Sequence, residues 1–287
     1  MNKLSAGKTI AYAYSFTFAN LGTIIGLIWL PLVIATVLGF ISQYNSGAPD
    51  SADQMSFARV SQGIGVLAGL LLSFLLYAIV FVAVTRQALG LRQGPAVVHF
   101  ALGMPEFRMF GAVLMLFAVS LFGFILFAGV LDALASAGGA VAQGLAELMS
   151  LPLALLYFYA IVRLTFLVVP ITLIEEHVSL LRSWQLTANN FWRILVIMLA
   201  VSLPILVLYV VGAAFVLGPD VSAPVPASIA NNATAFWSYQ QDIIRRHQPE
   251  LVFLQLMLAP FALGLNLSAS AYAYRALVAN APAARSA

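Results

Sequence analysis

Residues 109–131 read MFGAVLMLFAVSLFGFILFAGVL and contain no Asp, Glu, Lys or Arg. An α-helix rises about 1.5 Å per residue, so about 20 apolar residues cross a hydrocarbon core roughly 30 Å thick. This stretch therefore predicts a transmembrane helix. Five comparable stretches occur at 20–42, 63–85, 152–174, 194–217 and 251–273. We expect an all-α, polytopic membrane helix bundle of six spans, forming a single integral membrane domain over residues 1–287.

The composition excludes several classes of protein. Hydrophobic residues make up 62% of the chain and charged residues 8%, against about 45–50% and 25% in soluble globular domains. Too little polar surface is present to cover a water-soluble protein of this size. The absence of cysteine excludes disulfides, thiolate metal sites and cysteine nucleophiles. A net charge of +3, spread along the chain, predicts no nucleic-acid partner.

The basic residues are divided unequally between the two sides that six spans create. Nine of the thirteen share a side with the N-terminus: Lys3, Lys8, Arg86, Arg92, Arg108, Arg182, Arg193, Arg275 and Arg285. Only Arg59, Arg245 and Arg246 fall on the other side. Because positive residues are retained in the cytoplasm, this asymmetry predicts that both termini are cytoplasmic. Lysine is scarce beside arginine, two residues against eleven, which suggests a GC-rich bacterial genome. With the topology, this composition leads us to expect a multi-pass protein of the bacterial cytoplasmic (inner) membrane.

Amphipathic segments on the cytoplasmic side are predicted at 4–19, 96–108 and 177–192. In the last, Val178, Leu181, Trp184, Ala188 and Phe191 recur every three or four residues, as in a helix lying on a membrane surface. Aromatic side chains recur at 84-residue intervals, at Phe16, Phe100 and Trp184. This spacing suggests a pseudo-threefold repeat in which each unit is a surface helix followed by a two-span hairpin. A further interfacial helix is expected within the outer loop near 218–250.

Residues 170–193 read PITLIEEHVSLLRSWQLTANNFWR. This segment resembles the membrane domain found beside some bacterial glycerophosphodiester phosphodiesterases and in many stand-alone multi-span proteins of unknown function. The positions that carry the resemblance are Pro170, Glu175, Arg182, Ser183, Leu186, Phe191, Trp192 and Arg193. Asn189 and Asn190 stand where that family has a glycine. The resemblance implies a fold and a membrane location, and it implies no particular activity.

The hydrolase activity does not transfer with the resemblance. It belongs to a separate soluble barrel that begins with an H-R-G motif, which this chain lacks, and His99, His177 and His247 lie far apart in the sequence. Glu175, Glu176 and His177 are consecutive, and consecutive helical positions diverge rather than converge on a metal. We therefore expect no catalytic residue, no metal and no cofactor. The leading hypothesis is a non-enzymatic accessory, scaffold or lipid-associated protein.

Arg163 is the one charged residue inside a predicted span. A cation there costs about 2.5–3.5 kcal/mol on insertion scales, so it often faces a cavity or a partner. One interpretation makes Arg163 a contact for an anion or a lipid phosphate, since guanidinium groups fit phosphate oxygens. The alternative shortens the fourth span to about 145–163, so that Arg163 extends to the inner headgroups. The first interpretation supports a small transporter or channel-like permease for an anionic or lipid substrate.

Glu175 and Glu176 allow two interpretations as well. They could act as general bases or bind a cation, or they could form ion pairs with Arg182 or Arg193 that hold the surface helix against the fifth span. We favour the ion pairs, and with them a structural role for Trp184 and the rest of that helix. The expected partners are membrane lipids, while a protein partner or a second copy of the chain is left open.

Small residues in two spans predict close helix packing. Gly65 and Gly69 form a G-x-x-x-G pattern in the second span, and Gly264 with Ser268 forms a looser version in the sixth. Polar side chains at Asn266, Ser268, Ser270, Tyr272 and Tyr274 could line a pathway or could bond neighbouring helices.

Overall fold

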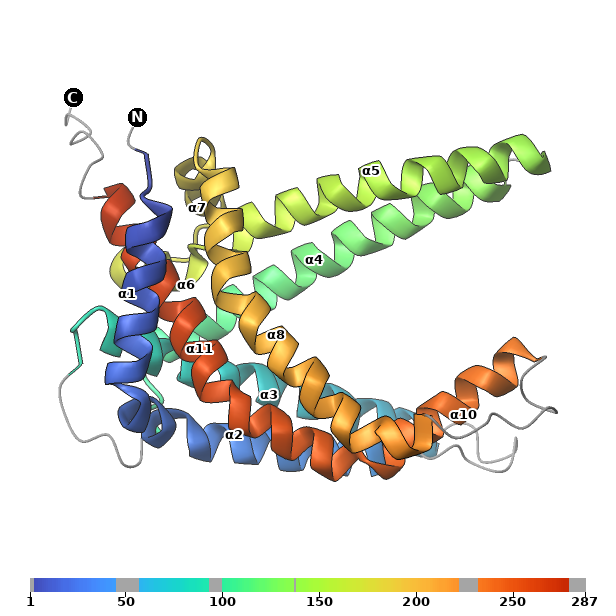
Figure 1. Cartoon of the computed structure of the whole chain (residues 1–287), viewed down its shortest axis with the longest axis horizontal. Coiled ribbons are helices and arrows are strands. Elements are labelled where there is room, and N and C mark those ends of the chain that lie inside the picture. The colour runs from blue at the N-terminus through green and yellow to red at the C-terminus, as the bar shows by residue number, and fades with distance from the viewer. Residues whose placement is uncertain (1–2, 45–56, 93–99, 137, 222–231, 279–287) are drawn as a thin grey trace.

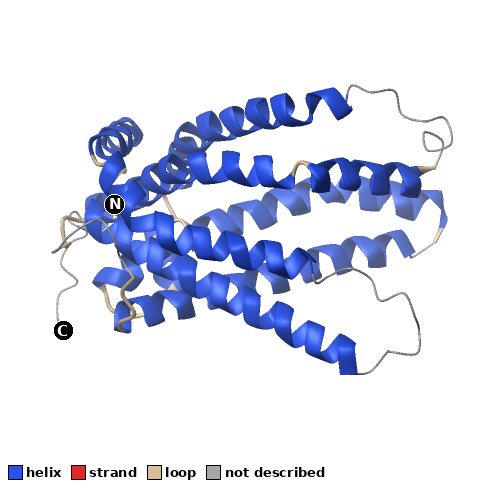
Figure 2. Cartoon of the chain, turned by 90° about the horizontal axis from the view of Figure 1, so that it is seen from below, coloured by secondary structure: helices blue, strands red, loops and turns tan. Residues whose placement is uncertain are grey.

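The computed structural model describes residues 3–44, 57–92, 100–136, 138–221 and 232–278, and every regular element in these ranges is a helix (Figures 1 and 2). The helices are α1 (Ala6–Ala19), α2 (Leu21–Tyr44), α3 (Phe57–Ala88), α4 (Met104–Ser136), α5 (Gly139–Thr165), α6 (Val168–Ile174), α7 (Leu180–Thr187), α8 (Phe191–Val221), α10 (Ala233–Arg246) and α11 (Gln248–Val278).

Six helical segments within the described residues are long and apolar enough to cross a membrane. They are Leu21–Ile41, Gly63–Ala88, Met104–Ser136, Val141–Ile174, Phe191–Gly218 and Gln248–Val278. Each contains or closely overlaps a span predicted from the sequence. The helical bundle with six spanning segments is therefore confirmed, and the chain is a multi-pass membrane protein.

The spanning helices form three hairpins, α2–α3, α4–α5 and α8–α11, which extend from a common end (Figure 1). We call this end, where α1 begins and α11 ends, the proximal end, and the opposite end the distal end. Helix α1 packs against α8 and α11 at the proximal end, and its buried residues are Thr9, Ala13 and Thr17. The segment predicted at 4–19 is thus a helix, but its inner face contacts protein.

The predicted surface helices at 96–108 and 218–250 have different outcomes. Residues 100–103 are not helical, α4 begins at Met104, and residues 96–99 lie outside the described part of the chain. The second hairpin therefore lacks, over the described residues 100–103, the preceding helix that the repeat requires, whereas the first and third hairpins have α1 and α7. In the distal loop, α10 is the helix expected near 218–250, with Ile243 buried and Trp237 exposed.

The fourth span is broken into α5 and α6 at Phe166 and Leu167. The break lies four residues before Pro170, which has no N–H for the carbonyl of Phe166 and whose ring clashes with that carbonyl. Helix α6 is largely buried: Val168, Pro170, Ile171 and Thr172 contact neighbouring helices rather than lipid. Because of the break, the last part of the fourth span, α6, is buried inside the proximal end of the bundle.

The α4–α5 hairpin separates from the rest of the bundle toward its distal tip (Figure 1). Within α4 the buried residues are Glu106, Met109 and Ala112, all in the first three turns. Farther along, α4 is held mainly by α5, where Tyr157 donates a hydrogen bond to the carbonyl of Ser120 over 3.0 Å. The distal two-thirds of this hairpin therefore presents apolar side chains to its surroundings on most sides.

Of the small residues singled out in the sequence, Gly264 has the close contacts. A Cβ atom there would lie 2.7 Å from the Thr17 methyl carbon and 3.0 Å from Ile24 Cδ1. A Cβ atom at Gly65 or Gly69 would have no neighbouring side chain within 4 Å. The helix approach predicted from small residues is thus found where α11 meets α1 and α2, and not along α3.

We expect Gly264→Ala to lower the free energy of unfolding by about 1–2 kcal/mol, because a β-branched, fully buried Thr17 cannot move aside easily. Gly65→Ala is the matched control and should leave stability unchanged or raise it by up to about 1 kcal/mol through helix propensity. Thermal unfolding of the two purified variants in the same detergent measures the difference. Equal stability would show that α1 does not hold α11 in this way.

Candidate functional site

Helix α7 packs against the C-terminal end of α5, next to the break in the fourth span. Its N-cap is Ser179, whose hydroxyl accepts a hydrogen bond from the Arg182 N–H over 3.2 Å. The helix ends at Thr187, so it is shorter than the segment predicted at 177–192. Its buried residues are Leu180, Ser183 and Thr187, while Leu181, which the periodicity placed on the apolar face of a membrane-surface helix, is exposed. The face of α7 that packs on the protein is thus largely polar.

The polar face of α7 satisfies a backbone group that the break exposes. A helix leaves its last four carbonyls without intrahelical partners. The carbonyl of Arg163 accepts a hydrogen bond from the Ser183 hydroxyl over 2.8 Å. The Thr187 hydroxyl donates to the Ser183 carbonyl over 2.8 Å and accepts a longer contact from Arg163 Nε over 3.4 Å. Ser183 therefore caps the end of α5, and both hydroxyls have partners on the buried face of α7.

Arg163 lies in the last turn of α5, and its side chain is held by the same helix. The residue is only 6% exposed. Its guanidinium donates to the Tyr159 hydroxyl over 2.7 Å and to the Trp184 carbonyl over 2.5 Å, with a longer contact of 3.4 Å to Thr187. The guanidinium carbon also lies 3.8 Å from the centroid of the Trp184 ring. Groups of the protein thus contact the Arg163 guanidinium from several directions.

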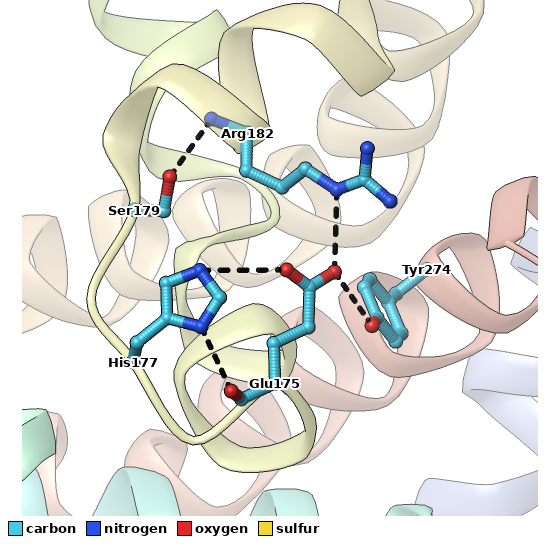
Figure 3. A network of polar contacts seen from close by, with 5 residues as sticks. All are labelled: Glu175, His177, Ser179, Arg182 and Tyr274. Carbon is cyan, nitrogen blue, oxygen red and sulfur yellow. Dashed lines mark hydrogen bonds and ion pairs between the residues drawn. The ribbon is translucent and has the colours of Figure 1, made fainter. Parts of the chain in front are cut away.

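Glu175 joins three elements at the proximal end (Figure 3). Its Oε1 atom accepts hydrogen bonds from the Tyr274 hydroxyl over 3.0 Å and from Arg182 Nε over 3.3 Å. His177 Nε2 lies 3.8 Å from Oε2 of the same carboxylate, so these two residues converge although the sequence suggested that they diverge. The predicted pair of Glu175 with Arg182 is confirmed, and it ties α7 to α11 as well as to α6.

Glu176 and Arg193 bind other partners than those predicted. Glu176 accepts a hydrogen bond from Arg108 at the start of α4 over 3.0 Å, and its φ of 58° makes it a non-glycine residue in the left-handed region. Arg193 donates to the carbonyl of Leu4 over 2.6 Å. Of the alternative ion pairs of Glu175 or Glu176 with Arg182 or Arg193, the structure thus forms the one between Glu175 and Arg182, because the turn directs Glu176 toward Arg108 of the second hairpin.

The first residues of the described chain are bound to the start of α8. The N–H of Leu4 donates to Asn190 Oδ1 over 2.9 Å, next to the bond from Arg193. Phe191 packs edge-on against Tyr159, with ring centroids 4.5 Å apart. Leu186 packs against the buried cluster around Ile194, whereas Trp192 is exposed. Asn190 thus has a specific structural role.

These contacts define what we call the proximal platform: residues 4–20, 86–91, 103–108, 159–193 and 271–278. All of the motif residues lie in it. Sequence reasoning missed Tyr159, Asn190 and Tyr274 as partners, and it missed Glu106, which is 1% exposed. Glu106 accepts a hydrogen bond from the Gly103 N–H over 3.0 Å. The sequence does contain a signal for this helix cap: Glu106 is the third residue of α4 and follows the small residue Gly103, which precedes the helix.

A cavity with convergent polar groups lies away from the platform, between the first and third hairpins. Its volume is about 620 Å³, within the range of roughly 300–1,000 Å³ common for small-molecule sites. Apolar side chains of α2, α8 and α11 form most of its wall. The polar side chains that line it are Thr36, Ser73, Tyr77, Ser202, Tyr209, Gln248, Gln255 and Asn266. Among the described residues lining the cavity, none is charged or a histidine.

The chemistry of the two regions differs accordingly. In the platform, the acidic and basic groups described above bind one another or backbone atoms, which suits a structural role. Within the described ranges, no group of three or more His, Asp or Glu side chains is arranged to hold a metal. The cavity offers hydroxyl and amide groups, which bind neutral polar molecules rather than ions.

Comparisons with protein-family models, with curated proteins and with solved structures find no match to this chain. The resemblance of residues 170–193 to the phosphodiesterase membrane domain therefore stays a prediction from the sequence.

We expect Arg163→Met to lower the free energy of unfolding by about 2–4 kcal/mol, because the Tyr159 hydroxyl and the Trp184 carbonyl lose a buried, charged donor. Arg163→Lys should also be destabilised, since an ammonium cannot reproduce the planar stacking on Trp184. Thermal unfolding, together with proteolysis near α7, measures both effects. The control is Arg245→Met, which changes an exposed arginine of α10. Full stability of Arg163→Lys would contradict a structural role for the contacts of Arg163 with Tyr159 and Trp184.

The left-handed conformation of Glu176 predicts a second pattern. We expect Glu176→Gly to keep wild-type stability or gain up to about 1 kcal/mol. Glycine relieves the backbone strain of the left-handed conformation, and this gain offsets the loss of an exposed ion pair. Glu176→Val should lose about 1–2 kcal/mol, since a β-branched residue is strained there. Unfolding midpoints in detergent test this order. If Gly and Val are equally destabilising, the ion pair with Arg108, and not the turn, determines the role of Glu176.

Proposed function

We propose that this chain is a non-enzymatic, lipid-associated protein of the bacterial cytoplasmic membrane. In this proposal the proximal platform holds the three hairpins together, and the cavity between the first and third hairpins holds a membrane lipid. The observation that carries the proposal is the 620 Å³ cavity inside the spanning region, lined by apolar and neutral polar side chains.

The position of the cavity supports a lipid over a water-soluble ligand. Its wall includes Leu206, a residue of the middle of α8 that is 55% exposed. Among the described residues, α11 contacts α8, α2 and α3, whereas α8 makes no extensive direct contact with α2 or α3. The side between α3 and α8 is therefore not closed by a neighbouring helix, and the cavity is accessible from the surrounding bilayer.

The proposed orientation places the proximal platform in the cytoplasm. Lys8, Arg108, Arg182 and Arg193 all belong to this end, as the positive-inside rule requires. The bacterial origin is supported by the resemblance of residues 170–193. Labelling of a cysteine placed at Asn189 by an impermeant reagent added outside intact cells would contradict this orientation.

An anion permease that uses Arg163 is the alternative from the sequence. It has less geometric support, because Arg163 does not line the cavity and its guanidinium donates to Tyr159 and Trp184. Loss of flux in Arg163→Ala with full flux in Arg163→Lys would favour that alternative. Hydrolase or transferase activity of the purified protein, lost on changing Glu175 or Arg182, would overturn the non-enzymatic proposal.

The central test is lipid retention by the purified chain. We expect native mass spectrometry in mild detergent to show about one bound lipid per chain, and Ala35→Trp to reduce it at least tenfold by filling the cavity. Val37→Trp is the matched control, because Val37 lies on the same helix, is exposed and does not line the cavity. No retained lipid on the wild-type chain, or equal retention by both variants, would overturn the proposal.

A further inference from the structure

Polar side chains stand at both ends of the stretch of α11 that lines the cavity. Gln248, the first residue of α11, lies at the distal end, and Asn266 lies 18 residues farther along the same helix. At about 1.5 Å per residue this separation is about 27 Å, which extends past the middle of the bilayer. Tyr209 and Thr36 line the wall between these two residues. A polar group could thus exchange one hydrogen-bonding partner for the next along the cavity.

The deep end combines donors and acceptors that have capacity left over. Asn266 Nδ2 donates to the carbonyl of Ala262 over 2.9 Å, and its Oδ1 accepts from the Ser202 hydroxyl over 3.1 Å. A side-chain amide has two N–H donors and two acceptor lone pairs, so one of each is still available. The Ser73 hydroxyl donates to the carbonyl of Gly69 over 2.8 Å and retains its acceptor sites.

The same lining is unfavourable for ions. A charge moved into the interior of a membrane protein loses its hydration and needs a counter-charge to compensate, or the cost is several kcal/mol. No described residue that lines the cavity supplies one. Arg163 is a buried cation, but its guanidinium donates hydrogen bonds to Tyr159 and Trp184 within the platform. A phosphate or an ammonium group is therefore disfavoured, whereas hydroxyl groups are matched by the hydroxyl and amide lining.

We infer that this cavity binds the uncharged, hydroxyl-bearing headgroup of a neutral lipid of the diacylglycerol class, with the hydroxyl at Asn266 and Ser202. The acyl chains leave through the open side between α3 and α8, along Leu206. The inference rests on the proposed lipid association and adds the class of headgroup. The cavity selects against phospholipids because it lacks a charged partner for the phosphate.

The experiment compares dioleoylglycerol with dioleoylphosphatidylglycerol, which has the same acyl chains and an anionic headgroup. The full-length protein is equilibrated with each lipid at equal concentration in mild detergent, and bound lipid is measured by native mass spectrometry. We expect at least a tenfold preference for dioleoylglycerol. Asn266→Leu should lower dioleoylglycerol binding by about threefold to tenfold, the range for one or two hydrogen bonds.

A second variant, Ser73→Ala, tests the same site in case Asn266→Leu does not fold. Ser73→Ala removes a hydroxyl whose donor bond is within its own helix, so the fold should persist while dioleoylglycerol binding falls by about threefold. Ser238→Ala, an exposed hydroxyl on α10, is the control and should leave binding unchanged.

The outcomes separate the inference from the proposed function. Equal binding of both lipids, or dioleoylglycerol binding that neither Asn266→Leu nor Ser73→Ala lowers, would overturn the headgroup assignment and leave lipid association intact. Displacement of dioleoylglycerol by millimolar free glycerol would also overturn it, because the site would then take a water-soluble polyol. Failure of the wild-type chain to bind any lipid would overturn both.

Discussion

The structure depends on one constraint: a helix that ends inside a membrane protein must have its last carbonyls satisfied, because hydrocarbon cannot do so. Pro170 ends α5 at Thr165, and the exposed carbonyl of Arg163 accepts a hydrogen bond from the Ser183 hydroxyl of α7. Once α7 is held there, its carbonyl at Trp184 accepts from the Arg163 side chain. The backbone and the side chain of a single residue thus fix the position of α7, the helix that precedes the third hairpin.

The platform concentrates the polar interactions between hairpins at one end of the molecule. Tyr12 of α1 donates to the carbonyl of Ala88 over 2.9 Å, Arg275 bonds the carbonyl of Leu89, and Arg108 binds Glu176. The first bond joins α1 to the end of the first hairpin, and the second joins the end of the third hairpin to the end of the first. The third joins the start of the second hairpin to the turn that follows α6. Farther from the platform, polar contacts such as those of Ser202 with Asn266 and of His247 with Asp220 join parts of a single hairpin. This difference leaves room for a cavity between the first and third hairpins, beyond the platform.

The sequence predicted what the bilayer dictates and missed what depends on tertiary contacts. Six spans follow from length and apolarity alone, and the pair of Glu175 with Arg182 follows from their positions on either side of a turn. The buried face of α7 could not be found from periodicity, because Ser183 and Thr187 are buried by hydrogen bonds to α5 rather than by hydrophobicity. The partner of Asn190 lies 186 residues away at Leu4, and such a pair leaves no local pattern. The cavity is likewise assembled from four helices, whose neutral polar residues carry no distinctive signal one by one.

The separated α4–α5 hairpin has a mechanical consequence. It is joined to the bundle near its base, next to the break at Phe166 and Leu167, and α5 alone is about 40 Å long. It therefore resembles a cantilever: a rotation of about 10° at the base would displace the tip by about 7 Å, given that length. Membranes of different thickness impose different tilts on a hydrophobic hairpin. The angle of this arm to the bundle is thus a quantity that the surrounding bilayer can set, while the residues at its base stay in place.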